Sequence, residues 1–221
     1  MESSNKRTLA HPTTFNQENT VTLLIGPDKK ALIVHEFRLA SSEFFKTAMK
    51  KEWAEGQTRT VSFLDDDPDD FAYYLDWMYF GNLPTSIYDE YDVSLDKDTD
   101  DTWELLARLY VLRERLLNTP FRNALMIEII RIALVAEESS FPYFPGTFSA
   151  NIIYAGTPEH SPARRLFVDM SVRYGGAHWH TRALNQKFLF DFMQAVYGEL
   201  SKRGSSSVWR GTPLRAEDYL V

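Results

Sequence analysis

Two groups of side chains in this sequence have the types and spacing that could hold a metal ion. His178 and His180 lie two residues apart, so on a strand both imidazoles would face the same side. Residues 65–70 read DDDPDD, which places five carboxylates close together. The histidines lack a third ligand at a defined spacing, and the aspartates lack the glycine and distal glutamate of a calcium loop. We therefore expect an aromatic loop at the histidines and a helix N-terminus at the aspartates, with no metal at either.

Other signals of catalysis are missing. The chain has no cysteine, which excludes disulfides, thiolate zinc sites and cysteine nucleophiles. It also lacks a GxxxxGK[ST] phosphate loop, a GxGxxG sequence after a strand and a GxSxG nucleophile elbow. His35 could be a general base, although a lone histidine at a strand–helix junction is more often a hydrogen-bonded core residue. We expect no enzymatic activity, and neither a cofactor nor a metal.

The charge of the chain is distributed unevenly. Its 221 residues carry a net charge of −7. Residues 1–120 hold 22 acids and 13 bases, and the stretch from Asp65 to Asp101 holds 13 acids with Lys97 as its one base. Such an acidic half disfavours nucleic-acid binding, which needs a basic patch, and suits either a solvated surface or a basic protein partner.

Targeting and membrane signals are also missing. The first 18 residues are polar, so they do not form a signal peptide, and we expect a flexible leader there. The longest apolar run, 124–136, contains Glu128 and Arg131 and is too short and too charged to span a bilayer. We expect no membrane association and a location in the cytoplasm, the nucleus or both.

The first hundred residues show the pattern of an α+β domain. Apolar runs at 21–25 and 31–34 flank a Gly-Pro-Asp turn and predict a β-hairpin. Apolar residues then recur every three or four positions from His35 to Ala48, which predicts an amphipathic helix that buries an aromatic face. Gly56 should end the following segment, and residues 58–64 alternate as a third strand.

A second helix should begin at Asp67 and Pro68, a capping residue followed by a proline suited to the first helical turn. It should end near Gly81. The acidic stretch 85–101 has no apolar period and is expected to be an exposed loop.

The remaining chain predicts mainly helices, and a few residues are expected at the centre of the core. Leucines at 105–116 mark a helix, and Thr119-Pro120 should begin the next one. Its interior, 124–136, is apolar on nearly all sides, and although a strand is possible for such a run, its length favours a central buried helix. Segments 141–151, 162–174, 184–200 and 204–221 read as a packed loop, two further helices and a flexible tail. The residues expected to be largely buried are His35, Leu39, Phe45, Leu75 and Leu109.

The order of these motifs resembles that of the BTB/POZ domain. The family pattern is a strand hairpin, H-x-x-x-L with a downstream serine and phenylalanine, a third strand, then F-x-x-x-L and a Y-x-G ending. Here these read HEFRLASSEFF and FAYYLDWMYFG, followed by the leucine-rich LLARLYVLRERL. The resemblance covers residues 19–125 and implies a small three-stranded sheet capped by helices. Residues 126–203 are similar to the C-terminal helical extension of many fungal members.

The triplet Trp53-Ala54-Glu55 is similar to the hydrophobic-x-Glu motif by which BTB proteins dock onto cullins. The resemblance implies that Trp53 buries its ring in a cullin interface, with Glu55 as a polar contact and Met49 and Tyr79 close by. It implies a non-catalytic adaptor, a substrate receptor of a cullin-based ubiquitin ligase. The alternatives are a BTB scaffold that self-associates or regulates transcription without a cullin, and a Trp53 that packs inside its own domain.

Two features depart from the family pattern and bear on oligomeric state. Many members have an aspartate where this chain has Thr20, and members that dimerise by strand exchange carry an extra apolar strand at the front. Residues 1–18 offer no such strand, so a strand-exchanged homodimer is not expected. The chain also lacks kelch repeats, zinc fingers and ankyrin repeats, which leaves the identity of the protein partner open.

Overall fold

The chain folds into a small three-stranded sheet and a larger set of helices, and the α+β class predicted from the sequence is confirmed. A computed structural model describes residues 19–83, 99–138, 144–174, 185–201 and 214–220. The strands are β1 (Thr20–Ile25), β2 (Lys30–His35) and β3 (Thr60–Phe63). The helices are α1 (Glu36–Leu39), α2 (Glu43–Ala48), α3 (Ala54–Thr58), α4 (Pro68–Phe80), α5 (Thr99–Leu116), α6 (Thr119–Glu138), α7 (Thr147–Gly156), α8 (Pro162–Tyr174), α9 (Gln186–Ser201) and the 3-10 helix η3 (Ala216–Asp218). In the described part of the chain, no helix combines the length and the apolarity needed to cross a bilayer.

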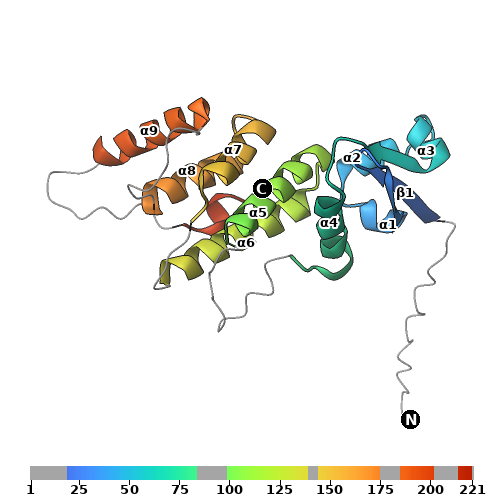
Figure 1. Ribbon diagram of the computed structural model, residues 1–221, viewed down its shortest axis with the longest axis horizontal. Coiled ribbons are helices and arrows are strands. Elements are labelled where there is room, and N and C mark those ends of the chain that lie inside the picture. Colours follow the sequence, from blue (N-terminus) through green and yellow to red (C-terminus); the bar gives the residue numbers. More distant parts are fainter. Residues whose placement is uncertain (1–18, 84–98, 139–143, 175–184, 202–213, 221) are drawn as a thin grey trace, which may run out of the picture.

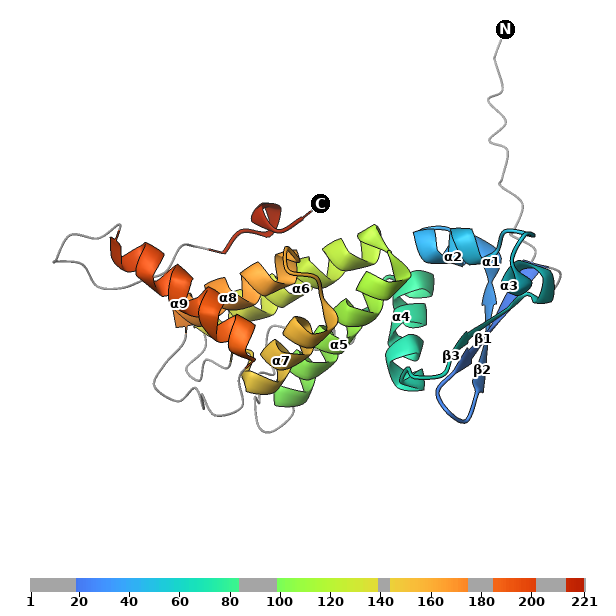
Figure 2. The ribbon, with the colours of Figure 1, turned by 90° about the horizontal axis from the view of Figure 1, so that it is seen from above.

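These elements form an elongated molecule. Figures 1 and 2 show the sheet and α1–α4 at one end and α7–α9 at the other. Helix α5 lies between the two ends and packs on both, because it contacts α2 and α4 on one side and α6 and α7 on the other. Each end therefore shares part of its core with the same helix.

The predicted hairpin is confirmed. Strands β1 and β2 pair antiparallel with Thr20 opposite His35, and β3 joins the other side of β1 in parallel, so the strand order is β2-β1-β3. Alternate residues of β1 are buried, as one face of a half-covered sheet requires. The turn after β1 begins at Gly26, whose φ of 74° is a conformation that glycine adopts without strain.

The predicted start and end of α4 are also confirmed. The Asp67 carboxylate accepts a hydrogen bond of 2.8 Å from the backbone N–H of Asp69, and Pro68 occupies the first turn. Gly81 ends the helix in the left-handed region. Asp66 pairs with Arg115 and Asp70 with Arg108, so two acids of the DDDPDD run bind α5. Burial raises the pKa of Asp70, and the Arg108 charge opposes that rise.

The single helix expected from His35 to Ala48 is wrong, because the chain forms two short helices there. Ser42 separates them with an extended backbone, and its hydroxyl accepts from the backbone N–H of Phe45. The same hydroxyl donates to the carbonyl of Leu116 on α5 at 2.5 Å. This long-range bond holds the break in place. Phe37 on α1 lies outside the core, and its side chain is 52% exposed.

Gly56 does not end the segment before β3 as expected, because it lies inside α3. A Cβ atom at this position would lie 2.2 Å from the carbonyl oxygen of Lys50. Glycine therefore lets α3 fold tightly back onto the chain that follows α2. The helix ends instead at Arg59, which has a left-handed φ of 53° and whose guanidinium binds the Thr20 carbonyl and Glu36. The third strand is shorter than the expected 58–64.

The helices at the centre of the chain differ from expectation in two places. Residues 99–101, expected in the acidic loop, form the first turn of α5. Helix α6 is not buried on all sides, since Ile127, Leu134 and Val135 are exposed. It also runs without a break across the boundary expected after residue 125.

Two C-terminal segments are more ordered than the sequence suggests. The expected loop at 141–151 is wrong in its second half, because α7 begins at Thr147. The expected flexible tail is wrong for residues 214–220. There Tyr219 is buried, donates a 2.6 Å hydrogen bond to Asp169 on α8, and stacks against the Arg165 guanidinium. Residues 1–18, 84–98, 175–184 and 202–213, which include His178 and His180, lie outside the described residues.

Most of the residues expected at the centre of the core are there. Leu39, Phe45 and Leu109 are buried, whereas His35 and Leu75 are only partly buried. His35 reaches the surface because it precedes α1 at the edge strand, and Leu75 packs against the core from its margin.

The buried amide of Asn118 connects the α5–α6 turn to the sheet end of the molecule. Its nitrogen donates to the hydroxyls of Ser41 at 3.0 Å and Tyr74 at 2.9 Å, and its oxygen accepts from the backbone N–H of Phe121 at 3.1 Å. Asn118 is thus the N-cap of α6 and a cross-link to α4 and the α1–α2 turn. Burial raises the pKa of Tyr74 to about 12, so its hydroxyl remains protonated at neutral pH.

We predict that Asn118→Ala lowers the free energy of unfolding by about 2–4 kcal/mol, because it removes a helix cap and leaves buried hydroxyls without a partner. Urea titration followed by circular dichroism measures the change. Thr119→Ala, at the exposed neighbouring position, is the matched control and should be close to neutral. Equal effects of the two substitutions would contradict the role assigned to the Asn118 side chain.

Candidate functional site

Trp53, the residue expected to contact a partner with its ring, is exposed in this structure. It precedes α3, and 53% of its surface is accessible. Its backbone N–H donates to the Lys50 carbonyl at 3.0 Å and its carbonyl accepts from Gln57, so the backbone is fixed while the indole makes no ring contact with a described residue. Trp53 is therefore not one of the buried residues of the core.

Glu55 lies in the first turn of α3, two residues after Trp53. It is half-buried, and a carboxylate at this position interacts favourably with the positive end of the helix. The close fold of α3 onto the backbone after α2 holds both residues in fixed positions. An exposed tryptophan with an acid beside it is thus presented by a short, well-supported helix.

Met49 lines a groove between α1 and α2. The groove has a volume of about 220 Å³. Leu39, Phe45 and Met49 form its apolar floor, and the side chains of Lys46 and Lys50 stand along its rim. Met49 is partly buried and packs against the core, so it contributes to the groove wall more than to a free surface.

Tyr79 belongs to a different cluster, at the end of α4. Its hydroxyl lies 2.7 Å from Nδ1 of His35, within hydrogen-bonding distance, and accepts from the backbone N–H of the same residue at 3.0 Å. The Arg38 guanidinium lies 5.1 Å from the ring centroid of Tyr79 and 5.1 Å from that of Phe37. These two bonds give the histidine at the strand–helix junction a structural role, because they join the end of β2 to the end of α4.

The structure thus brings only some of the expected partner residues together. Trp53 and Glu55 lie next to each other at the start of α3, and Met49 lies four residues before Trp53. Among the described residues, no hydrogen bond, ion pair or ring contact joins Tyr79 to Trp53 or Glu55. Figures 1 and 2 both place α3 at the outer end of the sheet, away from α4. Tyr79 therefore supports the fold at the α1–α4 contact rather than the surface at Trp53.

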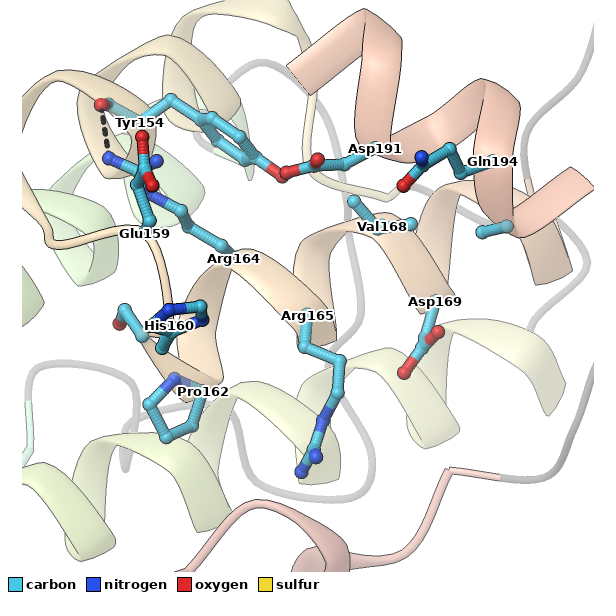
Figure 3. A pocket seen from close by; sticks show the side chains of 12 residues that line it. Tyr154, Glu159, His160, Pro162, Arg164, Arg165, Val168, Asp169, Asp191 and Gln194 are labelled. Carbon is cyan, nitrogen blue, oxygen red and sulfur yellow. Dashed lines mark hydrogen bonds between the residues drawn. The ribbon is translucent and has the colours of Figure 1, made fainter. Parts of the chain in front are cut away.

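A larger pocket opens at the other end of the molecule, between α7, α8 and α9. Its volume is about 630 Å³, and its walls combine charged and apolar side chains (Figure 3). Arg164 is buried at one side, where it donates to the carbonyls of Tyr154 and Thr157 and to the Thr157 hydroxyl. These bonds satisfy the C-terminal carbonyls of α7 and hold the start of α8 against it.

Two further polar contacts join the walls of this pocket. The Tyr154 hydroxyl donates to Asp191 on α9 at 2.8 Å, and Glu159 pairs with Lys187 at 2.7 Å. Burial, followed by the hydrogen bond to Asp191, raises the pKa of Tyr154, so the phenol remains a donor. The arrangement joins α7, α8 and α9 to one another.

The comparisons with known proteins add no family assignment. No protein-family model matches the chain, and no curated protein sequence matches it. Within the described ranges, no group of three or more histidine, aspartate or glutamate side chains is arranged to hold a metal ion. The surface features at α1–α3 are therefore the strongest functional evidence that the chain provides.

The sequence did not predict two surface features, the groove between α1 and α2 and the pocket between α7, α8 and α9. The groove has a signal in the sequence, because Lys46, Met49 and Lys50 lie within five residues of one another, at the end of α2 and just after it. The pocket has none, because its walls come from three helices that meet only in the folded chain.

We predict that Tyr79→Phe lowers the free energy of unfolding by about 1–2 kcal/mol, because it removes the hydroxyl that binds both the ring and the backbone of His35. Denaturant titration measures the loss. Tyr73→Phe is the matched control on the same helix, since Tyr73 is 39% exposed and should tolerate the change. A Tyr79→Phe protein as stable as the parent would remove the structural role given to this bond.

Proposed function

We propose that the chain is a non-catalytic adaptor built on a BTB/POZ-type domain and that its α3 surface docks onto a cullin, which makes it a substrate receptor of a cullin-based ubiquitin ligase. The observation that carries this proposal is the exposed Trp53, held at the start of α3 with Glu55 in the following turn. A large aromatic side chain on a rigid backbone is the type of residue that dominates binding energy in protein interfaces.

The arrangement of the first half supports the BTB/POZ part of the proposal. The three residues of the H-x-x-x-L and serine pattern have related structural roles: His35 binds Tyr79, Leu39 is buried, and Ser42 caps α2. The tyrosine of the Y-x-G ending is the one that binds the histidine, so two distant pieces of the sequence pattern meet in space. A parallel β1–β3 pair next to a hairpin agrees with the small sheet that the resemblance implies.

The non-catalytic part rests on how polar side chains are used. His35, Tyr154, Arg164 and Asp169 all make hydrogen bonds that join secondary-structure elements. Exposed apolar side chains, in contrast, are numerous at both ends of the molecule. A surface of this kind suits association with other proteins.

We predict that Trp53→Ala weakens binding to a cullin N-terminal region by at least about 2 kcal/mol while the fold remains intact, because the exposed indole contributes to the interface and not to the core. Glu55→Ala should weaken binding and Glu55→Lys should weaken it further, through an unfavourable charge in the interface. Isothermal titration calorimetry gives the affinities and circular dichroism reports the fold.

Two controls match these substitutions. Phe80→Ala removes another exposed aromatic ring, 72% accessible and on α4, and Asp76→Lys reverses an exposed acid on the same helix, away from α3. Both should bind as the parent does. A parent protein that binds no cullin would overturn the cullin proposal. Loss of the fold in Trp53→Ala would show that this side chain stabilises the domain itself.

A second candidate function, a BTB scaffold that self-associates without a cullin, is favoured by one observation. Strand β2 is an edge of the sheet, and Ile33 on it is 72% exposed. Edge strands with exposed apolar residues pair readily with another chain. Phe37 continues this apolar surface onto α1, where it is 52% exposed.

Under this second candidate, light scattering at micromolar concentration should show a dimer, and Ile33→Lys should convert it to a monomer because a charge on an edge strand opposes pairing. Val135→Lys, at an exposed apolar position of α6, is the control and should leave the dimer unchanged. A parent protein that is a monomer at every concentration tested excludes self-association through β2.

A further inference from the structure

The groove between α1 and α2 is large enough for a side chain of a binding partner. Its volume is about 220 Å³. An apolar protein cavity of about 150 Å³ accommodates benzene, so a leucine, methionine or phenylalanine side chain fits the groove. Leu39 and Phe45 are each 1% exposed and form a rigid apolar floor, and Met49 provides an adaptable wall.

The rim of the groove is basic although the chain as a whole is acidic. Lys46 and Lys50 line it, and Lys51 follows directly. Lys46 makes an exposed ion pair with Glu43 at 2.5 Å, which contributes little in water, and neither Lys50 nor Lys51 pairs with a described acid. On the α1 side, Glu36 is already paired with Arg59 at 2.8 Å.

This combination of charges selects the partner. In a chain of net charge −7, this groove is lined by two lysines, and its one acid, Glu36, is already paired with Arg59, so the groove favours acidic ligands over basic ones. A carboxylate that pairs with Lys46 or Lys50 would hold the adjoining apolar side chain above the floor. The lysine stems are themselves apolar and extend the wall that this side chain would contact.

We propose that the α1–α2 groove binds an acidic segment of a partner protein, in which one large apolar side chain enters the groove and flanking carboxylates pair with Lys46 and Lys50. The inference rests on the proposed adaptor function, because an adaptor needs a second binding surface beside the one at Trp53. It assigns that second surface and the chemical class of the segment that it recognises.

The experiment uses the full chain and a displayed library of random dodecapeptides. Peptides that are selected should carry one large apolar residue flanked by at least two acids. In fluorescence polarisation, the double substitution Lys46→Glu/Lys50→Glu should weaken such a peptide at least tenfold. A peptide in which lysines replace the acids should bind the double variant better than the parent protein. Lys187→Glu, which reverses an exposed lysine of α9 far from the groove, is the charge-reversal control and should leave peptide binding unchanged.

A second variant tests the groove itself rather than its charge. Ala40→Phe, at an exposed position that lines the groove, should block the apolar side chain and abolish peptide binding while the circular dichroism spectrum is unchanged. Selection of neutral or basic peptides, or failure to select any, overturns the proposal. So does equal binding to the parent and the double variant.

The same measurements distinguish a partner segment in the groove from a segment of this chain. If acidic peptides bind only after residues 85–98 are replaced by a Gly/Ser linker, the groove is occupied by the acidic segment of this chain and the partner proposal is overturned. A protein that binds acidic peptides but no cullin loses only the proposed ligase function. A protein that binds a cullin but no acidic peptide loses only the groove inference.

Discussion

The hydrogen bonds of one buried side chain, Asn118, constrain how the sheet end of this molecule sits on α5 and α6. The amide connects the start of α6 to the hydroxyls of Ser41 and Tyr74, and the Ser42 hydroxyl binds the last carbonyl of α5 beside it. Because these bonds are buried or nearly so, each group must keep its partner or lose the energy of a hydrogen bond. The position of α1 and α2, and with it the shape of the groove, depends on a turn that is about 75 residues further along the chain.

The local signals of the sequence predicted those elements whose ends are set by neighbouring residues. Asp67 and Pro68 begin α4 and Gly81 ends it, because a cap, a proline and a left-handed glycine act within one helical turn. The hairpin followed in the same way from a glycine turn between two apolar runs. Such features need no knowledge of the rest of the chain.

Features set by distant residues were predicted poorly. The break between α1 and α2 depends on a bond from Ser42 to Leu116, which no local pattern indicates. Helix α7 begins within a segment rich in proline and glycine, and it forms there because it packs on α5. The two helices are so close that a Cβ atom on Gly156 would lie 2.4 Å from the Val111 side chain. The candidate site shows the same division. The triplet at Trp53 was visible in the sequence, whereas its exposure and the separation of Tyr79 from it depend on the folded chain.

Helix α5 also fixes the positions of the groove and the pocket relative to each other. Its 18 residues correspond to about 27 Å at 1.5 Å per residue. The α1–α2 groove lies near the C-terminal end of this helix, where Ser42 binds the carbonyl of Leu116. The pocket between α7, α8 and α9 lies beside the same half of the helix, where Ser161 contacts Tyr110 and Glu114. The distance between the two sites is therefore set by a few residues of one helix, and so is the geometry of any assembly that uses both.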